Sequence, residues 1–405
     1  TDVAWHSTMM IYPLVVALAT KQGRDISRLQ GSHMPDHLQL RLGGWGEAIV
    51  PADLGHRTTV DCVEYSVRNS PRWALGCPQA YDIRERGLTA AGEIAIGLAI
   101  VCKTMDDLAL RGVNVDQVAP SLAWVSSSDI DFFEEIAKFR ALRRIWARTM
   151  KDRFGAKDNR SLRLRIACHT AGRSLVYPQP LNNLSRAALQ TMAALLGGVQ
   201  SVETCTYDEP ICIPTEEARE LATRTQQILA HEIGAARVAD PLGGSYYIES
   251  LTNKVEADAL AMFTKIEALG LVKSIEDGTI ESWMDDYNYN IKRELDRGDR
   301  VIVGVNRFAP KNVAPPTRFT FDPSRMETHV KRFKERQAAR DMSILKQRID
   351  ALYQVARRRE NSHQAMIDAL IADASIGEVW GTVRAANNLP YDPFRIVQSP
   401  FQYPV

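Results

Sequence analysis

The sequence predicts an α/β fold built on a parallel sheet that helices cover. Short apolar segments alternate with longer amphipathic ones from about residue 74 to residue 234, which is the β, α, β, α order of such folds. The apolar runs are too short and too apolar to form strands with one face in water, which favours a buried parallel sheet. The chain has 405 residues, of which 45% are hydrophobic, so it can bury one large core or two smaller ones.

Each element follows from a local pattern. The segment 129–150 has apolar residues at three- and four-residue spacing, which is typical of a helix packed on a sheet. These residues are Phe132, Ile136, Phe139, Leu142, Trp146 and Met150. Gly112 ends a long helix, and Thr215 is a suitable N-cap for another. We expect helices at 8–23, 89–112, 129–150, 182–198 and 215–234, and strands at 74–82, 121–127, 161–170 and 199–205.

The pattern changes after Pro241. We expect helices around 249–269 and 276–297, then a strand-like segment at 300–308 and a proline-bearing link at 309–323. From Ser324 to about Ile376 the chain is highly charged, and we interpret it as a separate helical region. Acids are interleaved among its basic residues, so a solvated helix face is favoured over an anion site. The basic residues are Lys331, Arg332, Lys334, Arg336 and Arg340.

The composition bounds the possible partners and the compartment. Lysine plus arginine number 50 and aspartate plus glutamate 49, so no net field attracts nucleic acid or an anionic membrane surface. No run approaches the roughly 18 apolar residues of a membrane span. The six cysteines show no CxxC pair or metal-finger spacing, which indicates reduced structural thiols and a cytoplasmic location. The first helix has no strand before it, so we expect the chain to start within a fold.

Polar side chains stand where four predicted strands end. In a parallel β/α barrel such ends meet at one mouth. Taken singly, each residue has an ordinary structural interpretation. Tyr81 would pack at the rim of the barrel, and His169 would form an ordinary hydrogen bond. Asp82 would pair with Arg84 or Arg86 at the surface, and Glu203 would cap a turn. Taken together, two carboxylates and an imidazole at one mouth indicate a site. The strand-end residues are Tyr81, Asp82, Ser126, Ser127, Ser128, His169, Thr170, Glu203 and Thr204.

Other mechanisms have little support in the sequence. It contains no GxGxxG after a strand and no GxxxxGK[ST] loop for a nucleotide, and it lacks the GxSxG and HExxH motifs. His169, Asp82 and Glu203 have the ligand types of a one-histidine, two-carboxylate metal site, which we keep as a minor alternative.

Several segments, taken in order, carry a family resemblance between about residues 10 and 310. They are VNVDQVAPSLAW, FFEEIAKFRALRRIWA, LRLRIACHTAGRSL, NNLSRAALQTMAALLGGVQSVETCTYDE, RTQQIL, VADPLGGSYYIESLT and VIVGVNRF. On these segments the chain resembles the methylmalonyl-CoA mutase family, the adenosylcobalamin-dependent acyl-CoA mutases. Its layout is most similar to the large subunits of two-component members, such as the isobutyryl- and 2-hydroxyisobutyryl-CoA mutases, because the cobalamin domain with its DxHxxG motif is absent.

The resemblance implies a (β/α)8 TIM-type barrel followed by a helical C-terminal region. This chain would hold strands 4 to 8, the first near residues 28–34. Another chain would supply the rest, an interpretation that we favour over a truncated product. The implied domains are a partial-barrel substrate domain at 1–245, a helical extension and linker at 246–322, and a C-terminal helical region at 323–405 that contacts the barrel or a partner. Adenosylcobalamin would be bound mainly by a small subunit, and the substrate would be an acyl-CoA.

This chain departs from the family's pattern at the site. Ala80-Tyr81-Asp82 stands where the family has Gly-Tyr-His, and residues 167–170 (ACHT) stand where it has His-x-Gln-Thr. Residues 201–205 (SVETC) replace Ser-Leu-His-Thr-Asn, and residues 31–34 (GSHM) replace Gly-Thr-x-Gln. The family's carboxylate-binding arginine has no clear match at 42–45, so we do not expect methylmalonyl-CoA as the substrate.

From this comparison we predict roles for particular residues. The predicted catalytic residues are Tyr81, Asp82, His169 and Glu203. The predicted substrate-binding residues are Ser32, Met34, Ser126, Arg165, Thr170 and Gln200. The predicted cofactor-binding residues are Thr204, Gly243 and Glu249, and no metal ligand is predicted.

The changed residues leave two interpretations of the acids open. Asp82 can donate a hydrogen bond to a thioester carbonyl only when protonated, which burial beside Glu203 favours. Alternatively, His169 pairs with one acid and the other meets a substrate ammonium group. In a radical mutase the cofactor supplies the difficult chemistry, so changed polar residues are compatible with a divergent mutase that performs a 1,2-rearrangement. A non-catalytic mutase-like scaffold subunit and a metal-dependent lyase are the alternatives.

Overall fold

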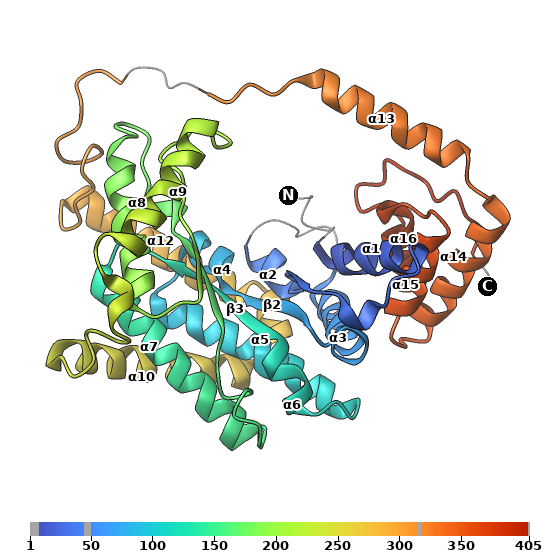
Figure 1. Ribbon diagram of the computed structural model, residues 1–405, viewed down its shortest axis with the longest axis horizontal. Coiled ribbons are helices and arrows are strands. Elements are labelled where there is room, and N and C mark those ends of the chain that lie inside the picture. Colours follow the sequence, from blue (N-terminus) through green and yellow to red (C-terminus); the bar gives the residue numbers. More distant parts are fainter. Residues whose placement is uncertain (1–7, 44–49, 314–317, 404–405) are drawn as a thin grey trace. The chain divides into compact units, whose positions relative to one another are not determined.

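The computed structural model describes residues 8–43, 50–313 and 318–403 (Figure 1). The chain divides into two compact units. The first unit is drawn from the segments 1–76, 107–121 and 321–405, and the second from 77–106 and 122–320. The three-part division that the sequence predicts, with boundaries after 245 and 322, stays a prediction.

A parallel sheet carries or adjoins many of the predicted site residues. Its five strands are β1 (Gly31–His33), β2 (Trp73–Gln79), β3 (Leu122–Ser128), β4 (Ile166–Thr170) and β5 (Ser201–Glu203), in that spatial order. The pairs β1–β2, β3–β4 and β4–β5 are parallel. Helical segments connect successive strands, which is consistent with the predicted α/β barrel-type fold. The register sets His169 opposite both Ser127 and Glu203.

The second unit surrounds its strands with helices whose apolar faces the sequence had indicated. Ile136, Phe139 and Trp146 are buried, and their helix packs against its two neighbours, α8 and α10. The helices of this unit are α4 (Ala80–Gly87), most of α5 (Ala90–Leu110), α7 (Phe132–Arg148), α8 (Asn182–Leu196), α9 (Glu216–His231), α10 (Tyr246–Leu269), α11 (Leu271–Glu276) and α12 (Thr279–Arg297). A π-helical turn, Thr149–Arg153, extends α7.

Two local features position these elements. A Cβ on Gly97 would overlap the ring of Trp124, so glycine at this position lets α5 approach β3 closely. The hydroxyl of Thr215 accepts a hydrogen bond from the backbone N–H of Ala218 at 3.3 Å. Thr215 therefore caps α9 as predicted.

The first unit is mainly helical. Tyr12 lies at its centre, with ring centroids 5.5 Å from His33, 5.2 Å from Trp73 and 5.6 Å from His363. Its helices are α1 (Thr8–Lys21), α2 (His37–Leu42), α3 (Ala52–Asn69), α6 (Val115–Val118), α13 (Pro323–Ala338), α14 (Met342–Arg357), α15 (His363–Ile371) and α16 (Ile376–Ala386). The sequence patterns did not predict α2 and α3.

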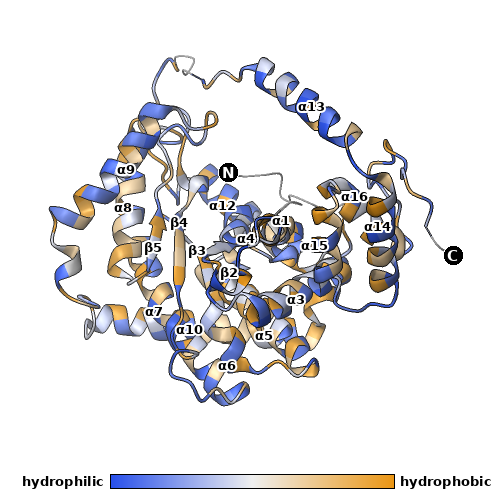
Figure 2. Cartoon of the chain, turned by 45° about the vertical axis from the view of Figure 1, so that its right-hand side comes forward, coloured by the Kyte–Doolittle hydropathy of each residue, from blue (hydrophilic) through white to orange (hydrophobic). Residues whose placement is uncertain are grey.

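The basic residues of α13 form the solvated face that the sequence predicts. α13 has no buried residue and is mostly hydrophilic in Figure 2. Lys331, Arg332, Lys334 and Arg336 are all exposed. Arg340 lies beyond the helix and pairs with Glu378 at 2.7 Å. No helix within the described ranges is long and apolar enough to span a membrane.

Two expectations for the second unit need correction. Residues 300–308 do not form a strand, and the described chain there has one isolated bridge, between Val303 and Arg307. The side chain of Asn306 accepts from the N–H of Ile302 at 2.8 Å and donates to the carbonyl of Arg300 at 2.7 Å, so the segment turns back on itself. The helix expected at 276–297 begins only at Thr279, because the chain adopts a left-handed conformation just before it.

Candidate functional site

Four predicted residues stand at the carboxyl ends of strands. β2 ends at Gln79 and α4 begins at the next residue, so Tyr81 and Asp82 lie in the first turn of α4. His169 lies near the end of β4, and Glu203 is the last residue of β5. Because His169 and Glu203 are paired in the register, their side chains point to the same face of the sheet.

His169 is the centre of this group. Its Nε2 lies 2.6 Å from Oε2 of Glu203, and its ring centroid lies 4.6 Å from that of Tyr81. Burial by itself would lower the pKa of His169, but the hydrogen bond to Glu203 and the charges of Glu203, Asp82 and Glu209 raise it above the ordinary value. The same hydrogen bond lowers the pKa of Glu203. The buried Nδ1 of His169 has no hydrogen-bond partner among the described residues.

Two further carboxylates, which sequence reasoning missed, join this group. Glu85 lies one helical turn after Tyr81 on α4, and Glu209 lies in the loop after β5. A Cβ on Gly172 would lie 3.4 Å from Oε2 of Glu85, 3.4 Å from Cγ of Glu209 and 3.9 Å from the Tyr81 hydroxyl, so these side chains border one small space. The four-residue spacing from Tyr81 could have indicated Glu85, whereas no local pattern marked Glu209.

Burial controls the protonation of these groups. It raises the pKa of Glu85 to about 7, although Oε2 of Glu85 accepts a hydrogen bond from the N–H of Arg173 at 2.8 Å. The other oxygen, Oε1, has no hydrogen-bond partner in the part of the chain that is described. Burial and the charge of Glu85 also raise the pKa of Tyr81, so its hydroxyl stays protonated and can donate. Burial likewise raises the pKa of Glu209.

Asp82 is buried close to this group. It accepts a hydrogen bond from Nε2 of Gln79 at 2.8 Å, and its charge acts on His169. Arg84, a partner that the sequence suggested for Asp82, has its NH2 atom 3.3 Å from Glu135. The structure thus brings the four predicted catalytic residues together, and their catalytic roles stay predictions.

A buried ion network ties α5 and α7 to β3. Nζ of Lys138 lies 2.8 Å from Oε2 of Glu93 and 2.5 Å from Oε2 of Glu135, and it donates to the carbonyl of Ser127 at 2.6 Å. The side chains of all three charged residues are fully buried. Ser126, which the sequence suggested as a substrate contact, is also fully buried and donates to Oε1 of Glu93 at 2.5 Å.

Thr170 and Thr204 form hydrogen bonds within the core. Oγ1 of Thr170 accepts from the N–H of Cys205 at 2.7 Å, and the hydroxyls of Thr204 and Thr191 lie 2.8 Å apart. These bonds connect the end of β4 and the interior of α8 to the residues directly after β5. Both threonines are therefore structural here, and their predicted roles in binding stay predictions.

The other predicted residues are dispersed through the chain. Arg165 and Gln200 precede β4 and β5, at the amino ends of these strands, and Oε1 of Gln200 accepts from the N–H of Ile166 at 2.7 Å. Glu249 pairs with Arg140 of α7 at 2.6 Å, and Gly243 lies in the turn before α10. Ser32 and Met34 lie on β1 and directly after it, in the first unit.

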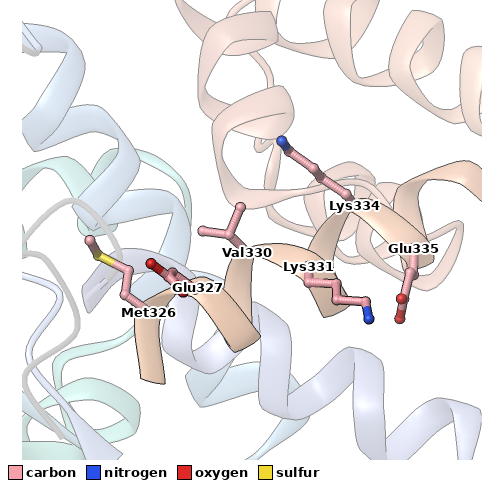
Figure 3. Close-up of a pocket in the computed structure, with 6 residues that line it drawn as sticks. All are labelled: Met326, Glu327, Val330, Lys331, Lys334 and Glu335. Atoms are coloured by element: carbon pink, nitrogen blue, oxygen red, sulfur yellow. The ribbon is translucent and has the colours of Figure 1, made fainter. Parts of the chain in front are cut away.

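A separate hollow lies on α13 in the first unit (Figure 3). Charges of both signs flank its apolar side chains, and it has none of the converging groups found at the strand ends. Its lining residues are Met326, Glu327, Val330, Lys331, Lys334 and Glu335.

The sequence profile for methylmalonyl-CoA mutase matches residues 4–388. The chain belongs to the methylmalonyl-CoA mutase family. The family resemblance carried by the sequence segments is therefore confirmed. A similar relative is the 2-hydroxyisobutanoyl-CoA mutase large subunit of Aquincola tertiaricarbonis, which is 36% identical over 388 residues.

Other methylmalonyl-CoA mutase family members match in the same region. The methylmalonyl-CoA mutase of Rhizobium meliloti is 36% identical over 374 residues, and the human mitochondrial methylmalonyl-CoA mutase is 32% identical over 339 residues. The matched regions take up 93%, 92% and 83% of this chain, respectively. They cover 69% of the large subunit but only 52% and 45% of the two methylmalonyl-CoA mutases, so the chain spans about half the length of the latter.

A metal-dependent site requires several ligands that converge on one point. Within the described segments, no three His, Cys, Asp or Glu side chains are arranged to hold a metal ion. His169, Asp82 and Glu203 therefore do not form such a ligand set.

Proposed function

We propose that this chain is the large-subunit component of an adenosylcobalamin-dependent acyl-CoA mutase, which performs a radical 1,2-rearrangement on a substrate other than methylmalonyl-CoA. The observation that carries the proposal is the group formed by Tyr81, His169 and Glu203 at the carboxyl ends of parallel strands in a member of this family. The changed residues at 80–82, 167–170 and 201–205 support a different substrate.

The side chains gathered at the strand ends are compatible with a cofactor that another subunit carries. This strand-end group consists of Tyr81, Asp82, Glu85, His169, Glu203 and Glu209. One relative is named the large subunit of its mutase, so we propose that a small cobalamin-binding subunit carries the adenosylcobalamin. When bound, adenosylcobalamin supplies the radical chemistry by cleavage of its cobalt–carbon bond. Nδ1 of His169 and Oε1 of Glu85 fit this arrangement, because among the described residues they have no partner and keep hydrogen-bonding capacity for a ligand.

This chain's own residues position the acyl group and need no strong acid–base pair. Tyr81 presents a hydroxyl that stays protonated, which suits donation to a thioester carbonyl. His169 shares a proton with Glu203 through Nε2 and is thereby oriented, so its Nδ1 is available to the substrate.

A second polypeptide would complete the sheet. The five described strands leave the outer edges of β1 and β5 unpaired within the described sheet. In a closed barrel every parallel strand has a neighbour on both sides, so both of these edges would be paired. We therefore propose that further strands come from another chain, in a hetero-oligomer with the cobalamin-binding subunit.

The second candidate is a non-catalytic scaffold that completes an active partner. The observation that favours it is the loss of several family side chains at once, with Asp82, Ala167 and Glu203 standing where the family has histidines. A scaffold needs the fold but no substrate-dependent chemistry. The two candidates therefore differ in whether a radical forms when acyl-CoA is added.

The test is to copurify the chain with its cobalamin-binding partner, load adenosylcobalamin and add a panel of acyl-CoA thioesters. We expect a substrate-dependent electron paramagnetic resonance signal from the cobalt. His169→Ala should reduce turnover by about 100-fold or more, because a positioned hydrogen-bonding group at the reacting acyl group is lost. The matched control is Glu216→Gln, an exposed carboxamide change in the first turn of α9, which should leave the signal intact.

The other outcomes separate the alternatives. Binding of the cobalamin subunit without any signal on addition of acyl-CoA supports the scaffold. A stoichiometric divalent metal in the purified complex, with lyase activity, supports the lyase.

A further inference from the structure

The strand-end group carries more negative charge than its single imidazole can balance. Glu85 and Glu209 border the same small space as Tyr81, and the charges of Asp82 and Glu209 act on His169 in addition to that of its partner Glu203. His169, when protonated, supplies one positive charge, and that charge is already hydrogen-bonded to Glu203. Glu85 and Glu209 are left without a bond to this imidazole.

The nearest arginines are bonded elsewhere. NH2 of Arg84 lies 3.3 Å from Glu135 and 3.7 Å from Asp129. The guanidinium of Arg173 donates to the carbonyl of Arg84 at 2.9 Å and lies over the ring of Tyr287. The charges of both arginines lower the pKa of Glu85 and that of Asp129 raises it, but the raising effect of burial is larger.

Two unsatisfied atoms point to a ligand in addition to the acidic cluster. Oε1 of Glu85 is buried and has no hydrogen-bond partner within the described segments, and the same holds for Nδ1 of His169. Buried polar atoms without partners are rare, and each is costly unless a ligand or water satisfies it. Gly172 leaves room beside Glu85, Glu209 and Tyr81, since an added Cβ would be in contact with all three.

We propose that this cluster binds an ammonium group on the substrate, so that the acyl-CoA is an aminoacyl thioester, with Glu85 and Glu209 as its specificity-determining carboxylates. The inference rests on the proposed function. An ammonium group offers three donors to acceptor-only carboxylates, and its charge favours the ionised form of each. A methylmalonyl group would place a further carboxylate among these acids, which is unfavourable.

The test measures binding by isothermal titration calorimetry to the chain copurified with its cobalamin-binding partner. Two probe pairs are used, β-alanyl-CoA with butyryl-CoA and 4-aminobutyryl-CoA with valeryl-CoA, because each pair exchanges a terminal ammonium for a methyl at constant length. We expect at least one amino probe to bind about 10- to 100-fold more tightly than its methyl counterpart, as charge-assisted hydrogen bonds predict. This ratio should fall by a similar factor in Glu85→Gln combined with Glu209→Gln.

Controls keep the outcomes distinct. Glu216→Gln makes the same chemical change at an exposed site and should leave the ratio unchanged. Circular dichroism checks that the double variant is folded. If the methyl probes bind as well as the amino probes, or better, the inference is overturned while the acyl-CoA function stands. If neither member of any pair binds, both the inference and the proposed function fail.

Discussion

At the scale of single residues, the pair of His169 and Glu203 sets the protonation of the site. The two side chains of this pair are buried to different degrees: 32% of the His169 side chain and 70% of the Glu203 side chain are exposed. Solvent therefore screens the pair, and its contribution to the free energy of unfolding is small. Its larger effect is on the pKa of His169, which burial alone would lower.

We predict that Glu203→Gln lowers the pKa of His169, because burial of the imidazole then acts without its main opposing partner. The measurement is a nuclear magnetic resonance titration of labelled histidine. In the unchanged protein the raised pKa means that the pair stabilises the fold below the unfolded value of about 6.5. This contribution is lost as pH rises through the pKa of the folded state.

Glu216→Gln serves as the control for this titration, since Glu216 is exposed in the first turn of α9. It should leave the titration of His169 unchanged. An unaltered titration in Glu203→Gln as well would mean that the 2.6 Å contact does not control the protonation of His169.

At the scale of elements, the buried network around Lys138 holds two helices to a strand. Lys138 lies on α7, Glu93 on α5, and Ser127 on β3, so the bonds of Lys138 to Glu93 and Ser127 cross between elements, whereas its pair with Glu135 lies within α7. Burial of three charges is costly, and the cost is balanced only while all of their partners are present. Removal of the central ammonium leaves two carboxylates buried side by side.

We predict that Lys138→Met lowers the free energy of unfolding by about 3–5 kcal/mol, because an uncompensated buried charge remains. Urea unfolding measures the change. Lys254→Met is the matched control: Lys254 is exposed and pairs with Asp258 one turn along α10, so its loss should change the free energy of unfolding only slightly. Equal effects of the two variants would contradict the assignment of the network as a structural tie.

At the scale of the whole molecule, acid should destabilise the fold through two buried histidines of the first unit. Burial lowers the pKa of both His33 and His363 to about 3. Nδ1 of His33 accepts a hydrogen bond from Trp73 at 2.8 Å, whereas neither ring nitrogen of His363 has a partner among the described residues. Both rings are therefore neutral in the folded chain at pH 7.

We predict that the stability of the chain falls between pH 7 and pH 5. The unfolded state binds protons near pH 6.5 and the folded state only near pH 3, so the stability is fully present above pH 6.5 and is lost as pH falls. Each histidine contributes roughly 2 kcal/mol of this loss at pH 5. Urea unfolding at the two pH values measures it.

His363→Phe should remove about half of this pH dependence. The phenyl ring keeps the stacking on Tyr12 and has no nitrogen to protonate. His231→Gln, at an exposed position, should leave the pH dependence unchanged. An equal loss of stability in His363→Phe and the unchanged protein would show that other groups control the acid response.

Much of the chain could be predicted from local sequence patterns, because helix periodicity, caps and strand length depend on neighbouring residues. The stripe of α7, the cap at Thr215 and the placement of Tyr81, His169 and Glu203 at strand ends were all derived in this way. The family also followed from short segments. The structure agrees with these predictions because each feature depends on residues within one helical turn or one strand.

Other features depend on contacts between distant parts of the chain, which local periodicity does not encode. Glu209, Glu85 and Tyr81 come close to Gly172 only in the folded second unit. Ser126 donates to Glu93, although sequence reasoning had assigned it to the substrate. Residues 300–308 have strand-like composition, yet side-chain hydrogen bonds from Asn306 fold them into a turn. The charge of the site, and hence the proposed ammonium group, follows from packing that brings carboxylates from separate segments to the same strand ends.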